Sequence, residues 1–290
     1  MERLERWSRG LAALGDATAG VMTAIYRALG RPGRLLQDLL NGSFLGHALH
    51  PVLTDVTIGG FTMVVALDLV ALIFHAGDLE TATRIVLGLT LLATLGTILT
   101  GLTDYKDTAS GDERNVATLH GWTNIAATVV YAVAFFLRLG GSVAIGQLLG
   151  LLAYLVVSAG AYIGGHLVFK YGYMVNRNAF AGGKRAKDFT AVLAVADLPD
   201  QTPTKAMLGT TAVVVVRRGD LVFALKETCS HAGGPLSGGT LTERGIVCPW
   251  HASEFRLSDG AVRHGPATTR QPTYRARVTD GQIEVQGPIR

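Results

Sequence analysis

Hydrophobic and polar positions divide the chain into two unlike halves. Long apolar runs with few charges follow one another from Leu53 to Tyr171, whereas short β-rich stretches alternate with Gly, Pro and Asp from Lys184 onward. A helix needs about 20 residues to cross a bilayer, and four of the apolar runs reach about that length. These runs are residues 53–75, 85–103, 116–139 and 143–169. The pattern therefore predicts a bundle of four transmembrane helices.

The second half has the pattern of a small antiparallel β domain. Its short β-branched runs are bounded by Gly or Asp, and Gly219-Asp220 and Asp280-Gly281 are typical hairpin turns. The predicted fold class is a membrane α-helical bundle joined to a small all-β domain. The predicted domains are an amphipathic N-terminal segment (1–40), a four-helix transmembrane domain (41–172), a linker (173–187) and the β domain (188–290).

The distribution of charge predicts the orientation in the membrane. The chain has 26 Lys and Arg against 22 Asp and Glu, with a pI near 9.2. The membrane face opposite the two termini has only Arg84 and Arg138. Short loops rich in Lys and Arg stay in the cytoplasm. We therefore expect a multi-pass protein of the bacterial inner membrane, with both termini and the β domain cytoplasmic. The face that carries the termini has Arg3, Arg6, Arg9, Arg27, Arg31, Arg34, Lys106, Arg114, Lys170, Arg177, Lys184, Arg185 and Lys187.

Because the basic residues lie beside apolar spans, the charge favours anionic lipid as a partner and not nucleic acid. Leu4, Trp7, Leu11 and Leu14 recur at helical spacing in the N-terminal segment. Such a helix either lies in the membrane interface or packs on the bundle, and the sequence leaves both readings open.

Histidines near the ends of the spans are candidate ligands in the membrane half. His50, His120 and His166 fall near the same predicted cytoplasmic face, together with His47. Two imidazoles facing each other across a bundle can hold a b-type haem, and a quinone is an alternative ligand. The competing interpretation is that these side chains lie at the level of the lipid headgroups and bond to loop carbonyls or carboxylates. Asp68 lies deeper, and we expect it to pair with a polar partner.

Three segments of this half resemble a known family. They are Leu45 to Asp55, which includes His47-Ala48-Leu49-His50-Pro51, then Gly101-Leu102-Thr103-Asp104, and Gly164-Gly165-His166-Leu167-Val168. They resemble a bacterial four-helix membrane family catalogued as a domain of unknown function (DUF2231-like), over about residues 40–178. The resemblance implies a fold and little mechanism.

Cysteine and histidine are paired in two motifs of the second half. Cys229-Ser230-His231 is followed, after sixteen residues, by Cys248-Pro249-Trp250-His251. This pair closely resembles the Rieske family, in which two thiolates hold one iron of a [2Fe–2S] cluster and two imidazoles hold the other. The resemblance implies that Cys229, His231, Cys248 and His251 are the metal ligands and that His264-Gly265-Pro266-Ala267 covers the cluster. A zinc site with the same four ligands is the chemical alternative.

The Rieske resemblance favours electron transfer as the function. Phe255 stands where the respiratory Rieske proteins have a Tyr, and their additional disulfide is missing, so we expect a reduction potential below the high end of the Rieske range. A complete oxygenase would need a further iron site, but only 39 residues follow His251. We therefore expect an electron carrier or oxidoreductase subunit, with a redox sensor or a ferredoxin serving a separate oxygenase as alternatives. The redox partner protein stays undetermined, and formation of a homo-oligomer stays open.

Overall fold

The computed structural model describes residues 2–180 and 186–289, and the side chains from Leu4 onward. Contacts divide these residues into two compact units. The first unit contains the described residues up to Gly30 together with Leu49–Tyr173, and the second contains Arg31–Ala48 with the described residues from Met174 onward. Of the predicted linker 173–187, residues 181–185 lie outside the described ranges.

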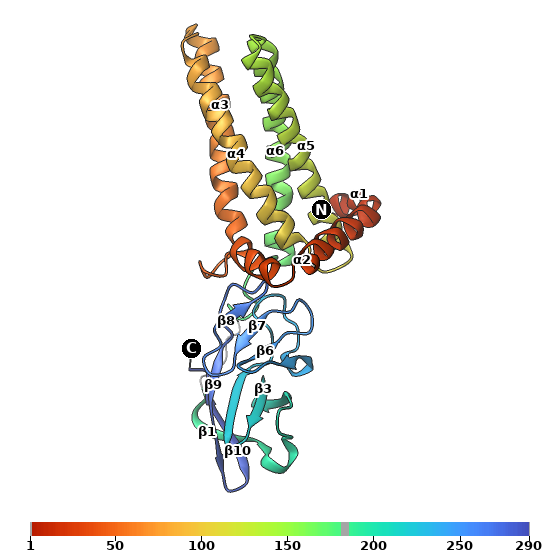
Figure 1. Cartoon of the computed structure of the whole chain (residues 1–290), viewed down its shortest axis with the longest axis vertical. Coiled ribbons are helices and arrows are strands. Elements are labelled where there is room, and N and C mark those ends of the chain that lie inside the picture. The colour runs from red at the N-terminus through yellow and green to blue at the C-terminus, as the bar shows by residue number, and fades with distance from the viewer. Residues whose placement is uncertain (1, 181–185, 290) are drawn as a thin grey trace. The chain divides into compact units, whose positions relative to one another are not determined.

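The first unit is built from helices (Figure 1). They are α1 (Glu2–Ser8), the 3-10 turn η1 (Arg9–Leu11), α2 (Ala12–Asn41), α3 (Leu49–Phe74), α4 (Leu79–Tyr105), α5 (Asp112–Leu139) and α6 (Val143–Tyr171). The helices α3 to α6 are each long and apolar enough to cross a membrane, which confirms the four predicted spans. Most of them start earlier than predicted because polar residues such as Asp112 and Glu113 form the first helical turn, where hydropathy gives no signal.

The four spans form two antiparallel pairs, α3 with α4 and α5 with α6 (Figure 1). Phe61 on α3 stacks on Tyr131 of α5 at a ring-centroid distance of 3.8 Å, and both side chains are fully buried. One face of α4 is lined by buried threonines whose hydroxyls donate to the carbonyl one turn earlier, as Thr90 and Thr94 do. Small and hydroxyl-bearing side chains of this kind let helices approach closely in lipid.

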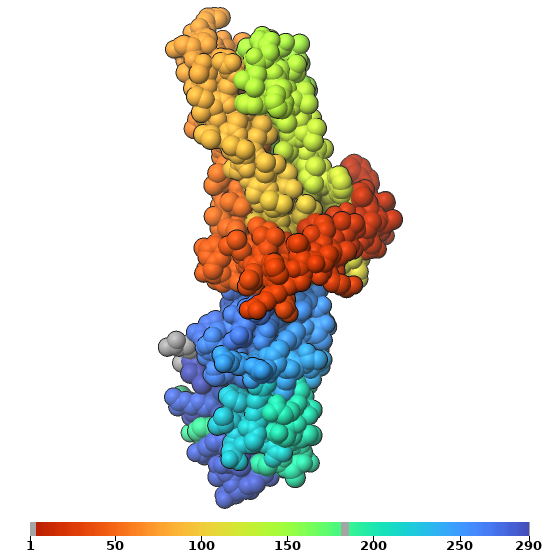
Figure 2. Space-filling view, viewed as in Figure 1, coloured from red at the N-terminus to blue at the C-terminus, as the bar shows by residue number. Residues whose placement is uncertain are grey.

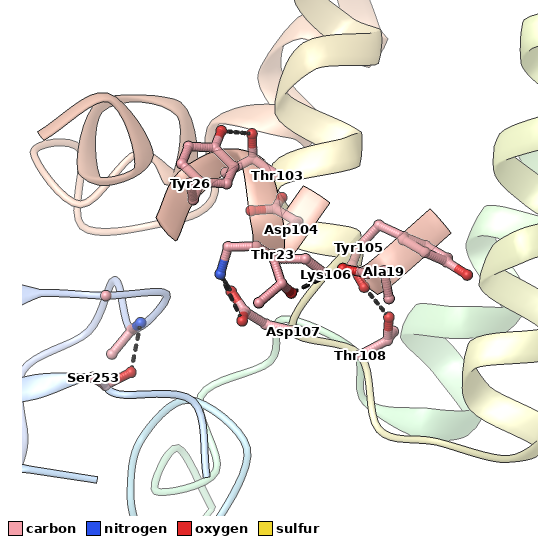
Figure 3. A network of polar contacts seen from close by, with 12 residues as sticks. Ala19, Thr23, Tyr26, Thr103, Asp104, Tyr105, Lys106, Asp107, Thr108 and Ser253 are labelled. Carbon is pink, nitrogen blue, oxygen red and sulfur yellow. Dashed lines mark hydrogen bonds and ion pairs between the residues drawn. The ribbon is translucent and has the colours of Figure 1, made fainter. Parts of the chain in front are cut away.

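The helix α2 is interrupted at Gly30, whose backbone has φ of +56° and ψ of −128°. The helical part before Gly30 belongs to the first unit, where Tyr26 bonds to Thr103 at 2.6 Å and Lys106 pairs with Asp107 (Figure 3). Apolar side chains such as Val21, Ile25 and Leu36 are exposed along α2, and Figure 2 shows α1 and α2 on the surface in red to orange. Part of the surface of α2 is therefore apolar.

The second unit contains two antiparallel sheets. The first has the order β1-β10-β9-β4-β3-β2 and the second has the order β5-β6-β7-β8. The strands are β1 (Ala186–Ala194), β2 (Thr204–Leu208), β3 (Thr211–Arg218), β4 (Leu221–Lys226), β5 (Thr240–Leu241), β6 (Gly245–Val247), β7 (Glu254–Arg256), β8 (Val262–His264), β9 (Thr273–Thr279) and β10 (Gln282–Gly287), with 3-10 turns η2 (Val195–Asp197) and η3 (Leu236–Gly238). The predicted all-β domain is confirmed.

The core of this unit has two layers because successive residues of β3 point to opposite faces. Val214 and Val216 pack with Cys229, Cys248 and Phe255 on one face. On the other face Val213 and Val215 pack with Leu198, Ile283 and Val285. One layer therefore supports the two loops that carry the cysteines.

Candidate functional site

Two loops of the second unit have the same backbone hydrogen-bond pattern. In the first, Cys229 N–H donates to the Gly234 carbonyl at 2.9 Å, and Gly233 N–H donates to the Cys229 carbonyl at 3.0 Å. In the second, Cys248 N–H donates to the Ser253 carbonyl at 2.9 Å, and Ala252 N–H donates to the Cys248 carbonyl at 3.1 Å. The two motifs therefore form equivalent loops, although one has Cys-x-His spacing and the other Cys-x-x-His.

Both loops need a left-handed residue four positions after the cysteine. Gly233 occupies this position with φ of +90°, and Ala252 occupies it with φ of +58°. Glycine adopts this conformation at no steric cost, whereas alanine is strained there. The two hydrogen bonds that close the second loop hold Ala252 in this conformation.

The loops bring the two cysteine sulfurs into contact. Both thiols are free and buried, and they hydrogen-bond to each other. This hydrogen bond lowers the pKa of Cys248 to about 7, helped by the backbone N–H groups of Trp250 and His251. It raises the pKa of Cys229, and burial adds to the effect. The hydrogen bond between the thiols therefore favours negative charge on Cys248 over Cys229.

The loops also bring two imidazoles together. The rings of His231 and His251 have centroids 5.1 Å apart and planes at 89°. Both side chains are half-buried, whereas the cysteines are buried. The four predicted ligands thus form a deep pair of thiols and a shallower pair of imidazoles.

This arrangement fits a two-iron cluster. A [2Fe–2S] centre of the Rieske type takes two thiolates on one iron and two imidazoles on the other. Within the part of the chain that the structure describes, no three His, Cys, Asp or Glu side chains converge on a single ion. Gly234 keeps the space beside the sulfurs open, since a Cβ there would lie 2.8 Å from Cys248 Sγ.

The predicted cover segment, residues 264–267, approaches the second loop closely. A Cβ on Gly265 would lie 2.7 Å from the Cα of Ser253, so only glycine fits. Ala267 N–H donates to Ser253 Oγ at 3.1 Å, and Ser253 is fully buried (Figure 3). The Ser253 hydroxyl proton is left to donate elsewhere.

Gln271 supports the first loop and was not predicted. Its Oε1 accepts from Ser230 N–H at 2.9 Å, and its Nε2 donates to the Lys226 and Thr228 carbonyls at 2.6 and 2.7 Å. The side chain is 1% exposed. A lone Gln gives no sequence signal, because its role depends on three backbone groups that lie more than 40 positions earlier.

Asp38 is a second supporting residue that the sequence did not indicate. It lies in the part of α2 that belongs to the second unit, and its carboxylate accepts from Gly265 N–H at 2.9 Å. His264 Nδ1 lies 2.7 Å from the same carboxylate. His264 is therefore a loop residue held by Asp38.

The structure brings together two of the three membrane histidines that were predicted as haem ligands. The rings of His50 and His120 have centroids 6.4 Å apart and planes at 89°. His166 instead contacts Tyr171, at 5.9 Å between centroids, and Glu5, at 3.9 Å. His47 is exposed and its Nδ1 lies 3.0 Å from the Ala48 carbonyl.

Asp68 has the polar partner that was expected. The Arg138 guanidinium bonds to Asp68 and also to Glu80, the latter at 2.9 Å. The Arg138 side chain is fully buried, so the two carboxylates compensate its charge within the bundle.

Comparisons with known proteins assign both halves of the chain. The model of the Rieske [2Fe-2S] domain matches residues 188–275, and the model of a predicted membrane protein family (DUF2231) matches residues 46–177. The anthranilate 1,2-dioxygenase ferredoxin subunit of Burkholderia cepacia is 32% identical over 92 residues, which are 32% of this chain and 85% of that protein. Ferredoxin CarAc of Metapseudomonas resinovorans is 32% identical over 80 residues, which are 28% of this chain and 75% of that protein.

A solved structure is also similar. The ferredoxin of carbazole 1,9a-dioxygenase from Nocardioides aromaticivorans IC177 is 29% identical, with 35% of this chain and 99% of that chain covered and a TM-score of 0.34. The domain match and the ferredoxin relatives imply a [2Fe–2S] cluster and transfer of electrons. With its Rieske domain fused to a DUF2231 membrane domain, the chain belongs to the Rieske [2Fe–2S] protein family.

Proposed function

We propose that this protein is a membrane-anchored one-electron carrier whose Rieske cluster is held by Cys229, His231, Cys248 and His251. The observation that carries the proposal is the pair of equivalent loops, which place two thiols in contact and two imidazoles 5.1 Å apart. A [2Fe–2S] cluster with this ligand set supplies one-electron redox chemistry. A mononuclear zinc site would need all four side chains to converge on one ion.

The residues around the ligands tune and protect the site. Backbone N–H groups of His231 and Ala232 point at Cys229 Sγ, and those of Trp250 and His251 point at Cys248 Sγ. Such bonds stabilise negative charge on sulfur. Phe255 is fully buried and has no hydroxyl to add a further bond. We therefore expect a reduction potential below the high end of the Rieske range, which reaches about +300 mV.

The half-buried imidazoles mark the place where electrons enter and leave. Trp250 is 57% exposed beside His251, and Pro235 and Pro249 are also exposed on the two loops. An apolar rim of this kind suits a transient protein contact. Because the relatives are named as ferredoxins, one of them a dioxygenase subunit, we propose a soluble reductase or oxygenase as the redox partner protein.

We further propose that the four spans anchor the Rieske domain at the cytoplasmic side of a bacterial inner membrane. The excess of Lys and Arg on the face that carries the termini supports this orientation. The exposed apolar side chains of α2 support contact with the lipid interface. A haem or quinone in the bundle would then exchange electrons with the cluster.

The ligand set is tested by EPR spectroscopy of the full chain in detergent after reduction with dithionite. We expect a Rieske signal in the wild type, its complete loss in Cys248→Ser and in His231→Ala, and its retention in the control His264→Asn. Iron and sulfide analysis should give two of each per chain. Retention of the signal in either ligand variant, or zinc in place of iron, would contradict the proposal.

The orientation in the membrane is tested by fusing green fluorescent protein to the C-terminus. The fusion protein should fluoresce if that end is cytoplasmic.

A further inference from the structure

The first unit, which contains the four spans, is called the membrane unit below. Its two helical hairpins, α3 with α4 and α5 with α6, are related by an internal repeat. Residues 70 positions apart on α3 and α5 contact each other three times along the bundle. His50 meets His120, Phe61 stacks on Tyr131, and Asp68 pairs with Arg138. The repeat is visible in the sequence, because the dipeptide Leu-His occurs at equivalent positions, Leu49-His50 and Leu119-His120. Equivalent residues that meet in pairs indicate an approximate two-fold relation between the two hairpins.

The second helix of each hairpin holds its imidazole in an equivalent way. His50 Nδ1 lies 3.0 Å from the Thr97 carbonyl on α4, and His120 Nδ1 lies 2.8 Å from the Gly160 carbonyl on α6. Four residues beyond each carbonyl is a glycine, and a Cβ on Gly101 or on Gly164 would lie 2.8 Å from the imidazole Cε1. Each ring therefore lies in a notch that only glycine provides.

These contacts fix the tautomer of both rings. A carbonyl can only accept, so each Nδ1 carries the proton and donates it. Each Nε2 atom then carries a lone pair and no proton. Neither Nε2 atom has a hydrogen-bond partner among the described residues. An Nδ1–H bonded to a carbonyl is the outer-shell contact that orients histidines that bind a metal through Nε2.

The spacing of the rings fits one metal ion between them. Metal–nitrogen bonds of about 2 Å on opposite sides of an ion place the two ring centroids about 6 Å apart. The rings of His50 and His120 are 6.4 Å apart. His166 is engaged by Tyr171 and Glu5 and does not belong to the pair.

We propose that His50 and His120 are the two axial ligands of a single b-type haem held between the two hairpins. Two imidazoles alone leave a bare ion with open positions, and no third His, Cys, Asp or Glu joins them within the described ranges. A porphyrin supplies the four equatorial nitrogens that complete six-coordinate iron, and its apolar ring suits a membrane bundle. The inference deepens the proposed electron-transfer function and rests on it only for the role of the haem.

The test is a pyridine haemochrome assay and a reduced-minus-oxidised spectrum of the full chain, purified in detergent from cells supplied with a haem precursor. We expect a haem-to-chain ratio of about one with a sharp α band. In His50→Ala and His120→Ala the ratio should fall at least about tenfold. In His47→Ala and His166→Asn it should stay at the wild-type value. The EPR signal of the cluster, measured in the same samples, shows that each variant is folded.

Glycine variants give a second test that leaves both ligands in place. Gly101→Ala and Gly164→Ala push Cβ into the imidazoles and should lower haem occupancy, whereas Gly59→Ala and Gly121→Ala, where a Cβ meets nothing within 4 Å, should not. External imidazole should restore the α band of a His120→Gly variant. A cluster-loaded wild type without haem, or haem that persists in His50→Ala or His120→Ala, would overturn the inference. If the cluster-ligand variants Cys248→Ser and His231→Ala lose the EPR signal of the cluster but keep the haem, the haem inference holds although the cluster is lost.

Discussion

The two units use approximate two-fold symmetry on different scales. In the Rieske unit, two loops 19 residues apart repeat one hydrogen-bond pattern and bring together Cys229 with Cys248 and His231 with His251. In the membrane unit, two helical hairpins repeat one packing pattern and bring together His50 with His120. In both cases two copies of one local structure bring a pair of equivalent side chains together.

The difference lies in what holds each pair. The loops are held by backbone amides and by single buried side chains such as Gln271, whereas the helices are held by side-chain pairs across the bundle such as Asp68 with Arg138. In lipid the helical backbone already satisfies itself, so only side chains are left to join the helices. The Rieske unit therefore depends on loop conformation, whereas the membrane unit depends on side-chain pairs between its helices.

Removing the buried positive charge of Arg138, in the last turn of α5, should have the largest effect on stability. Arg138→Met leaves Asp68 and Glu80 without their shared cation, and breaking a buried ion pair on one side costs about 3–5 kcal/mol. The loss of helicity during unfolding in denaturing detergent, followed by circular dichroism, measures this change. The cluster absorbance should be unaffected under mild conditions.

Two control variants test whether the stability loss comes from breaking the buried ion pair. Arg84→Met removes a partly exposed pair with Glu80 at 3.7 Å and should cost less than about 1 kcal/mol. The triple variant Asp68→Asn, Glu80→Gln, Arg138→Met removes all three charges and should recover much of the stability. If the single and triple variants are equally unstable, pairing does not hold the bundle.

Gln271→Leu tests whether single side chains hold the first loop. The change leaves Ser230 N–H and two carbonyls without their partner, and the cost should be on the order of 3 kcal/mol. Urea denaturation of the full chain, followed by the visible absorbance of the cluster, measures it. Gln282→Leu, at an exposed position of β10, is the matched control. An unchanged midpoint in Gln271→Leu would show that the loop holds itself.

Asp38→Ala should have a smaller, local effect. It removes the acceptor of Gly265 N–H and the partner of His264, which are worth about 1–2 kcal/mol. We expect faster hydrogen exchange at residues 262–267 with little change elsewhere. Asp38→Asn keeps an acceptor oxygen and should lie between the wild type and Asp38→Ala. Equal exchange in all three proteins would mean that this part of α2 does not restrain the segment.

The smallest effect concerns the contact of α1 with the bundle. Hydrogen bonds from Lys170 and Tyr171 lower the pKa of Glu5 below its usual value near 4.5. Because its pKa is depressed in the folded state, Glu5 contributes stability above its unfolded pKa and loses it as the pH falls through the folded pKa. Fluorescence of Trp7 on α1 should therefore change below about pH 4.5, and Glu5→Gln should remove that transition. A transition that persists in Glu5→Gln would assign it to another group.

Local patterns in the sequence were sufficient to predict the four spans and the Rieske domain. Apolar runs of membrane length predicted α3 to α6, and the spacing of Cys229, His231, Cys248 and His251 indicated the Rieske domain. Both signals are local because a helix satisfies its own backbone hydrogen bonds, and because each Rieske loop has its Cys and His within four residues.

Only the tertiary structure decided which distant residues meet. The sequence offered His50, His120 and His166 equally, and packing of the hairpins selected the first two. Asp38 reaches Gly265 across 227 positions, and no local pattern encodes such a contact. Hydrophobic periodicity determines which face of an element is buried but not which partner covers it, because the partner is set by the packing of whole helices and loops.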